Sequence, residues 1–130
     1  MRALHTNIVL RLLLDDDPQQ VAAARRLMAE PALIGTGVLM ETAWVLGSIY
    51  RQTRIAIADS LSALLKAPTL HVQDEDGVAW ALERFRNHGA DIADMLHIVS
   101  ARGSTSFASF ETKLNKQAGA QTPVPVERPA

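Results

Sequence analysis

The sequence predicts an α/β protein, with a small parallel sheet of four to five short strands flanked by helices. Short apolar segments alternate with longer segments whose apolar residues recur at helical spacing, which is the pattern of a sheet covered on both faces. The chain has 130 residues, of which 48% are hydrophobic and 21% charged, so one globular domain is expected. We place this domain at residues 1–122 and expect the proline-rich tail, residues 123–130, to fray.

The first third of the chain reads as strand, helix, helix, strand. A short strand is expected over Arg2–His5, and the hydroxyl of Thr6 can cap a helix over Asn7–Leu14. An aspartate followed by proline is typical of a cap and first turn, so the second helix runs over Pro18–Ala29. A second short strand follows over Ala32–Gly35.

The middle of the chain contains the most apolar helix. It is expected over Val38–Tyr50, and Thr53 then caps a helix over Arg54–Lys66 that has one apolar face. A proline separates this helix from a strand over Thr69–Val72, and a further helix covers Asp74–His88.

The last third adds a helix, a strand, a helix and a final strand. The helix Asp91–Arg102 ends at a glycine, and the strand Thr105–Ala108 precedes a helix over Glu111–Ala118. The final strand is expected over Gln121–Val124. In parallel sheets with this alternation, ligands bind at the carboxyl ends of the strands.

Composition excludes several classes of site. The chain has no cysteine, which excludes disulfides, cysteine-bound zinc, iron–sulfur clusters and thiol nucleophiles. Its formal net charge of −1 gives no general attraction to nucleic acid, so such binding needs a local basic patch. No apolar run approaches a membrane span and no signal-peptide cleavage site is recognisable, so we expect a cytoplasmic protein without membrane contact.

One histidine and four carboxylates stand at strand-to-helix connections, where they can gather along one edge of the sheet. These residues are His5, Glu41, Asp91, Asp94 and Glu111. Glu41 lies in a helix that is apolar on nearly every side, so we expect it to be partly buried and to need a partner; the alternative is that it faces one exposed stripe. Asp91, Asp94 and Glu111 have an alternative interpretation as helix caps and first-turn acids.

Other charged residues favour a solvated position. The acids Asp15–Asp17 read as exposed loop residues, and the short basic pairs read as exposed helix faces. Those pairs are Arg25–Arg26, Arg84–Arg86 and Lys113–Lys116. Among them, Lys113 and Arg86 are candidates for contact with phosphate.

Four stretches, in this order and spacing, resemble the motifs of the PIN-domain ribonucleases, and in particular the VapC-like toxins of type II toxin–antitoxin pairs. They are Leu4–Arg11, Met40–Leu46, Gly89–His97 and Ser109–Leu114. The loop Asp16–Pro18 also matches, and the resemblance extends from about Arg2 to Gln121. It implies a PIN-like three-layer sandwich and cleavage of RNA that depends on a divalent metal.

The resemblance also implies roles for single residues. The implied metal ligands are Glu41, Asp91, Asp94 and Glu111. The catalytic set is Asp94, Glu41 and His5, and the substrate-orienting set is Thr6, Asn7 and Ser109. The implied cofactor is Mg²⁺, and the implied partners are RNA, a small antitoxin protein and a second copy of the chain.

Two positions depart from the family pattern. His5 stands where the family has its first aspartate, and Glu111 stands where its fourth acid is usually aspartate. Because imidazole suits Mn²⁺ better than Mg²⁺, His5 favours Mn²⁺ and predicts an impaired site. The alternative is a catalytically inactive PIN-like module that binds an antitoxin or RNA without cutting. A phospho-acceptor receiver domain is disfavoured, because the first strand ends in His5–Thr6 and no strand ends in lysine.

Apolar surface predicts association. The helices Asn7–Leu14, Val38–Tyr50 and Arg54–Lys66 carry more apolar surface than one thin sheet can cover. We therefore expect a homodimer, with the antitoxin in an apolar groove.

Overall fold

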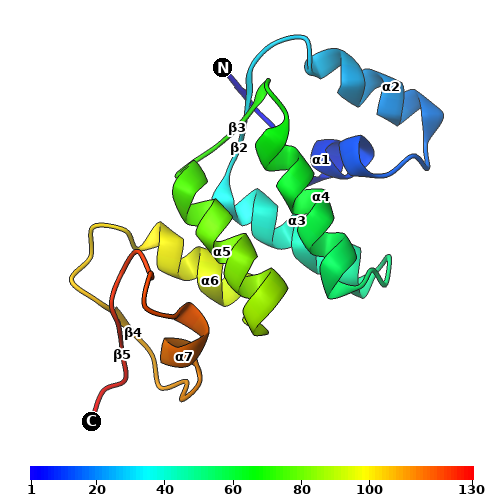
Figure 1. Cartoon of the computed structure of the whole chain (residues 1–130). Helices are drawn as coiled ribbons and strands as arrows, with labels where there is room; N and C mark the ends of the chain where they lie inside the picture. The colour runs from blue at the N-terminus through cyan, green and yellow to red at the C-terminus, as the bar shows by residue number, and fades with distance from the viewer. The chain divides into compact units, whose positions relative to one another are not determined.

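The computed structural model describes all 130 residues and has the predicted α/β architecture, with seven helices and short parallel strands (Figure 1). The chain divides into two compact units, Met1–Glu75 and Asp76–Ala130. None of the helices is both long and apolar enough to span a bilayer.

The first unit is built on a three-stranded parallel sheet of order β1-β2-β3. Its strands are β1 (Arg2–Ala3), β2 (Ala32–Ile34) and β3 (Leu70–Val72). In the central strand, Ala32 and Ile34 are buried while Leu33 between them is 36% exposed, as the alternation of a strand requires. Ala32 pairs with Arg2 on one side and Leu70 on the other.

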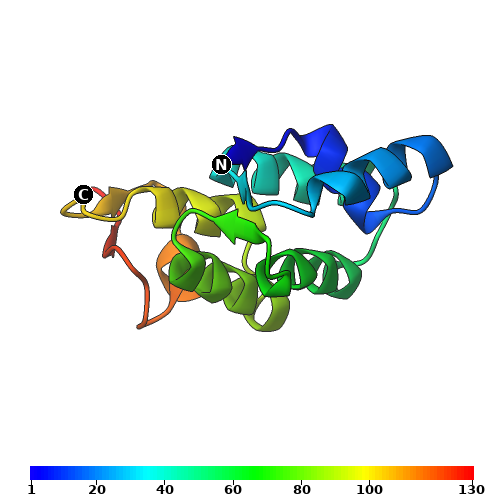
Figure 2. The ribbon, with the colours of Figure 1, turned by 90° about the horizontal axis from the view of Figure 1, so that it is seen from above.

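Four helices of the first unit pack on one another, and the last of them packs on the sheet. They are α1 (Thr6–Leu13), α2 (Pro18–Leu27), α3 (Thr36–Ser48) and α4 (Arg54–Lys66). Helix α1 contacts both α2 and α3, α3 contacts α4, and α4 contacts β3; Figure 2 shows α1 and α2 side by side. The core between them is aliphatic: Val9, Leu39, Leu46, Ala58 and Leu61 are each at most 2% exposed.

The second unit combines three helices with a two-stranded parallel sheet. The helices are α5 (Glu75–His88), whose first residue closes the first unit, α6 (Ile92–Ser100) and α7 (Leu114–Ala118). The strands are β4 (Phe107–Ala108) and β5 (Val126–Glu127). Val78, Ala81, Met95, Ile98 and Val124 are buried in its core.

The C-terminal segment differs from the prediction. The strand expected over Gln121–Val124 is wrong, and so is the fraying of the tail: β5 begins at Val126 and pairs with β4. Proline has no N–H to donate, but its carbonyl still accepts, and the Phe107 N–H donates to the Pro125 oxygen at 2.7 Å. The strands consequently form two sheets, of three and two strands, instead of one.

Local signals located most helix ends to within two residues. Thr53 caps α4 through its hydroxyl as predicted, and Asp17 caps α2. The final helix begins at Leu114 instead of Glu111, because Glu111–Lys113 form a turn before it.

Candidate functional site

His5 lies two residues after the end of β1 and caps α1. Its Nδ1 accepts a hydrogen bond from the backbone N–H of Asn7 at 3.2 Å, in an extended backbone conformation typical of a cap. This bond requires an unprotonated Nδ1, so the ring proton of the neutral imidazole lies on Nε2. The prediction that Thr6 is the cap is wrong, because the chain is already helical at Thr6.

Thr6 has a different function: it joins α1 to α3. The residue is 4% exposed, and its hydroxyl donates a short hydrogen bond to Oε1 of Glu41. A buried hydroxyl needs a partner, and here the partner is the carboxylate that the sequence singled out. Thr6 therefore fixes the position of the Glu41 side chain.

Glu41 itself is exposed, so the expected partial burial is wrong. The core-facing side of α3 is formed by Leu39, Thr42, Ala43 and Leu46, which are buried. Glu41 lies on the outward stripe, three residues before the exposed Trp44. The alternative interpretation, in which Glu41 faces an exposed stripe, is therefore correct. Of its two carboxylate oxygens, only Oε1 accepts a hydrogen bond from the protein.

Asp91 and Asp94 open α6, and Asp91 is its cap as the alternative interpretation predicted. The Asp91 Oδ1 accepts from the Asp94 N–H at 2.9 Å. Burial raises the pKa of Asp94, and the negative charges of Asp91 and Glu111 raise it further, while His97 opposes the rise. The negative charges of Asp91 and Glu111 thus both act on Asp94.

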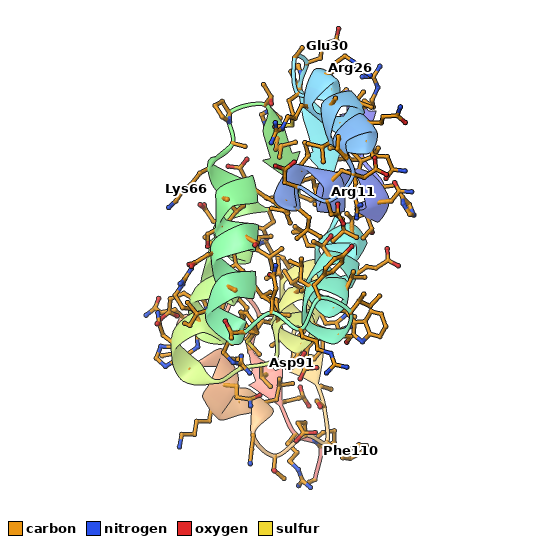
Figure 3. The ribbon with its side chains drawn as sticks, turned by 90° about the vertical axis from the view of Figure 1, so that its right-hand side faces the viewer. Arg11, Arg26, Glu30, Lys66, Asp91 and Phe110 are labelled. Atoms are coloured by element: carbon orange, nitrogen blue, oxygen red, sulfur yellow. The ribbon has the colours of Figure 1, made fainter.

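Ser109 positions the loop that carries Glu111. Its hydroxyl accepts from the Glu111 N–H at 3.0 Å, and its own N–H donates to the Glu127 carbonyl of β5 at 3.0 Å. The Glu111 side chain is exposed. The next residue toward the strand, Phe110, is 74% exposed and points outward (Figure 3).

The PIN domain family matches residues 3–119. This chain belongs to the PIN domain family. No curated protein and no solved structure matches it. PIN domains are generally nucleases that act on RNA and typically use divalent metal ions, which supports a nuclease-type function here.

The acids of this PIN domain have the chemistry that a divalent cation requires. Burial together with neighbouring negative charge disfavours the ionised form of Asp94, and a bound cation would relieve that repulsion. In neither unit do three acidic or histidine side chains gather to coordinate one ion. Mg²⁺ is commonly held by one or two carboxylates and several waters.

The structure also brings together residues that the sequence did not connect. Asp16, expected to be solvated, accepts from Arg11 at 2.7 Å and from the Tyr50 hydroxyl at 3.3 Å. Arg11 in turn donates to the Tyr50 oxygen at 3.3 Å, so α1, the following loop and the end of α3 are tied together. Tyr50 is 39 residues from Arg11 and 34 residues from Asp16 in the sequence, so no local pattern indicates these two contacts. Asn7 is exposed, and its backbone N–H is used by the His5 cap.

Proposed function

We propose that this PIN domain is a metal-dependent endoribonuclease and the toxin of a toxin–antitoxin pair. The observation that carries the proposal is the family match over residues 3–119, together with acids at the start of α6 and in the loop between β4 and α7. Glu41, Asp91, Asp94 and Glu111 would hold the cation, with Mg²⁺ as the usual ion. A bound divalent cation favours deprotonation of water and stabilises negative charge on phosphate.

The remaining site residues have positioning functions in this proposal. Thr6 restricts the carboxylate of Glu41, and Ser109 restricts the backbone of Glu111. Both contacts support the assignment of these two residues, with Asn7, as groups that orient the substrate and the acids.

His5 weakens this site without disturbing the fold. Its imidazole supplies the hydrogen-bond acceptor that a cap needs, so α1 forms. It does not supply the negative oxygen that an aspartate would, so we propose weak Mg²⁺ binding and a preference for Mn²⁺. The second candidate function is a PIN-like module that binds an antitoxin or RNA without cutting, and His5 is the observation that favours it.

Exposed apolar side chains support the proposed partners. Trp44, Ile49 and Ile55 are 64%, 62% and 52% exposed, and they lie along the end of α3 and the start of α4. Large exposed apolar side chains are typical of protein interfaces. We propose that this surface serves a second copy of the chain or the antitoxin, and that the protein acts in the cytoplasm.

The test is cleavage of a pool of 5′-labelled single-stranded RNAs by purified protein, with Mg²⁺ or Mn²⁺. Three proteins are compared: the wild type, Asp94→Asn and Asp76→Asn, where Asp76 is an exposed acid on α5. We expect Mn²⁺-supported cleavage that Asp94→Asn abolishes and Asp76→Asn retains. Cleavage that survives Asp94→Asn would contradict the proposal. An inactive wild type that still binds RNA would favour the second candidate.

A further inference from the structure

A cavity of about 560 Å³ in the second unit is lined by basic side chains. It lies between the C-terminal part of α5 and the short helix α7, and its lining residues are Arg84, His88, Lys113, Lys116 and Gln117. Four of these five residues carry a basic group. Lys113 and Lys116 are exposed, as predicted, and the structure also places them beside Arg84 from α5.

Arg84 is held in place at the wall of this cavity. Its Nε donates to the Gln117 carbonyl at 2.7 Å, and its Nη2 donates to the Lys116 carbonyl at 3.1 Å. Gly119 leaves room for the guanidinium, because a Cβ there would lie 2.8 Å from the Arg84 Cζ, and its φ of +75° also favours glycine. The guanidinium is therefore ordered before any ligand binds, which lowers the entropic cost of binding.

The two lysines supply positive charge that the protein does not neutralise. The ammonium groups of Lys113 and Lys116 form no ion pair, and both residues are exposed. Only three lysines occur in the chain, and the third is Lys66. The nearby carboxylate of Glu83 is bonded to His88 Nε2 at 2.9 Å, and it lies 4.0 Å from the Arg84 Nη1.

The cavity is adjacent along the chain to the acids of the proposed active site. Lys113 follows Glu111 by two residues, and His88 precedes Asp91 by three. Because an extended chain advances at most about 3.6 Å per residue, these Cα atoms lie within about 7 Å and about 11 Å of each other, respectively. A ligand strand with one phosphate at the acids can therefore place a neighbouring phosphate at the lysines.

We propose that this cavity binds backbone phosphates of the RNA strand next to the bond that is cut. The proposal rests on the nuclease function proposed above and adds to it a substrate-binding surface. An acidic protein segment is the other chemistry that fits basic groups. We favour RNA because the lining contains no large apolar residue such as phenylalanine, tryptophan or leucine to anchor a protein partner, whereas phosphate contacts need none.

The test measures binding without cleavage, by fluorescence anisotropy of a labelled single-stranded RNA in EDTA. The variant is Lys113→Gln/Lys116→Gln, and the matched control is Lys66→Gln, whose lysine points outward at the end of α4 (Figure 3). Each lost phosphate contact lowers the slope of log K against log salt by about 0.7. Two contacts thus remove about 1.4 from the slope and weaken binding at 0.1 M salt on the order of 25-fold.

Each outcome decides the proposal. A loss of this size in the double variant, with little change in Lys66→Gln and recovery in Lys113→Arg/Lys116→Arg, supports it. Equal affinities of the double variant and the control would overturn it, as would a wild type that does not bind RNA. Competition by an oligoglutamate as effective as that by RNA would assign the cavity to acidic protein segments instead.

A parallel cleavage assay separates this proposal from the nuclease function. Reduced binding by the double variant in a protein that cuts no RNA would keep the phosphate cavity and reject the nuclease. Cleavage by the wild type with unchanged binding by the double variant would keep the nuclease function and reject the phosphate cavity.

Discussion

Replacing His5 by aspartate separates the structural function of position 5 from its electrostatic one. In the structure, the His5 Nδ1 accepts from the Asn7 N–H, and an aspartate oxygen can accept the same bond. The substitution therefore retains the cap of α1 and adds one negative charge beside Thr6, which holds Glu41. His5→Asn is the matched control, because asparagine caps the helix equally well but adds no charge.

The expected magnitude follows from the exposure of this position. His5 is exposed, so the added charge interacts with a cation through a dielectric close to that of water. Two unit charges 4 Å apart in water interact by about 1 kcal/mol, which gives ~2 kcal/mol for a divalent ion. This corresponds to roughly 30-fold tighter Mg²⁺ binding. The free energy of unfolding of both variants should stay within about 1 kcal/mol of the wild type.

The assay has two readouts. Mg²⁺ affinity is measured by displacement of Mn²⁺, followed by electron paramagnetic resonance, and RNA cleavage is measured against Mg²⁺ and Mn²⁺ concentration. We expect little Mg²⁺-supported cleavage by the wild type or His5→Asn, some activity with Mn²⁺, and recovery with Mg²⁺ in His5→Asp. Robust Mg²⁺-dependent cleavage by the wild type, equal to that of His5→Asp, would show that the missing charge at position 5 does not limit activity. Three folded proteins that bind RNA but never cut it would favour the binding-module function.

Four further predictions concern the contacts around the acids and the exposed apolar surface. Thr6→Val removes the hydroxyl that holds Glu41, so we expect a loss of about 1 kcal/mol in urea unfolding and lower cleavage; unchanged values in both would contradict the positioning function. Asp91→Asn keeps the cap but removes a charge that raises the pKa of Asp94, so a ¹³C NMR titration should show a lower Asp94 pKa than in the wild type. Because the pKa of Asp94 is raised in the folded protein, its ionisation lowers the free energy of unfolding as the pH rises toward that pKa. Asp94→Asn should remove this decrease. Trp44→Ser should shift sedimentation toward monomer at micromolar concentration, and an unchanged monomer in both proteins would count against the proposed dimer.

Elements whose signals are local could be predicted from the sequence. Helix α4 begins and ends where its Thr53 cap and its apolar face indicated, because both signals lie within the helix itself. Strand β5 could not be located this way. In its pairing with β4, Val126 lies opposite Phe107, which is 19 residues away in the sequence. In addition, the prolines on either side of Val124 are typical of an unpaired tail, so the local sequence does not indicate a strand.

The candidate site shows the same division between local and long-range information. The cap at Asp91 was indicated by its spacing to Asp94. The sequence left open whether Glu41 is buried or exposed. Composition shows how apolar a helix is, but packing decides which side of the helix faces solvent. Arg84 donates to the carbonyls of Lys116 and Gln117, which follow it by 32 and 33 residues in the sequence. Because this contact is long-range, the sequence indicated only a pair of lysines on one short helix.

Position 5 illustrates why the fold and the chemistry of this site depend on different properties of the same residue. A cap needs only an acceptor atom, which histidine, asparagine and aspartate all supply. A cation site needs negative charge, which of these three only aspartate supplies at neutral pH. At Asp91 both requirements are met at once, because one carboxylate oxygen accepts from the Asp94 N–H while the negative charge of the residue still acts on Asp94. His5 meets the first requirement alone, so α1 forms while the site lacks one negative charge, and cleavage, metal affinity and stability should respond independently to substitution there.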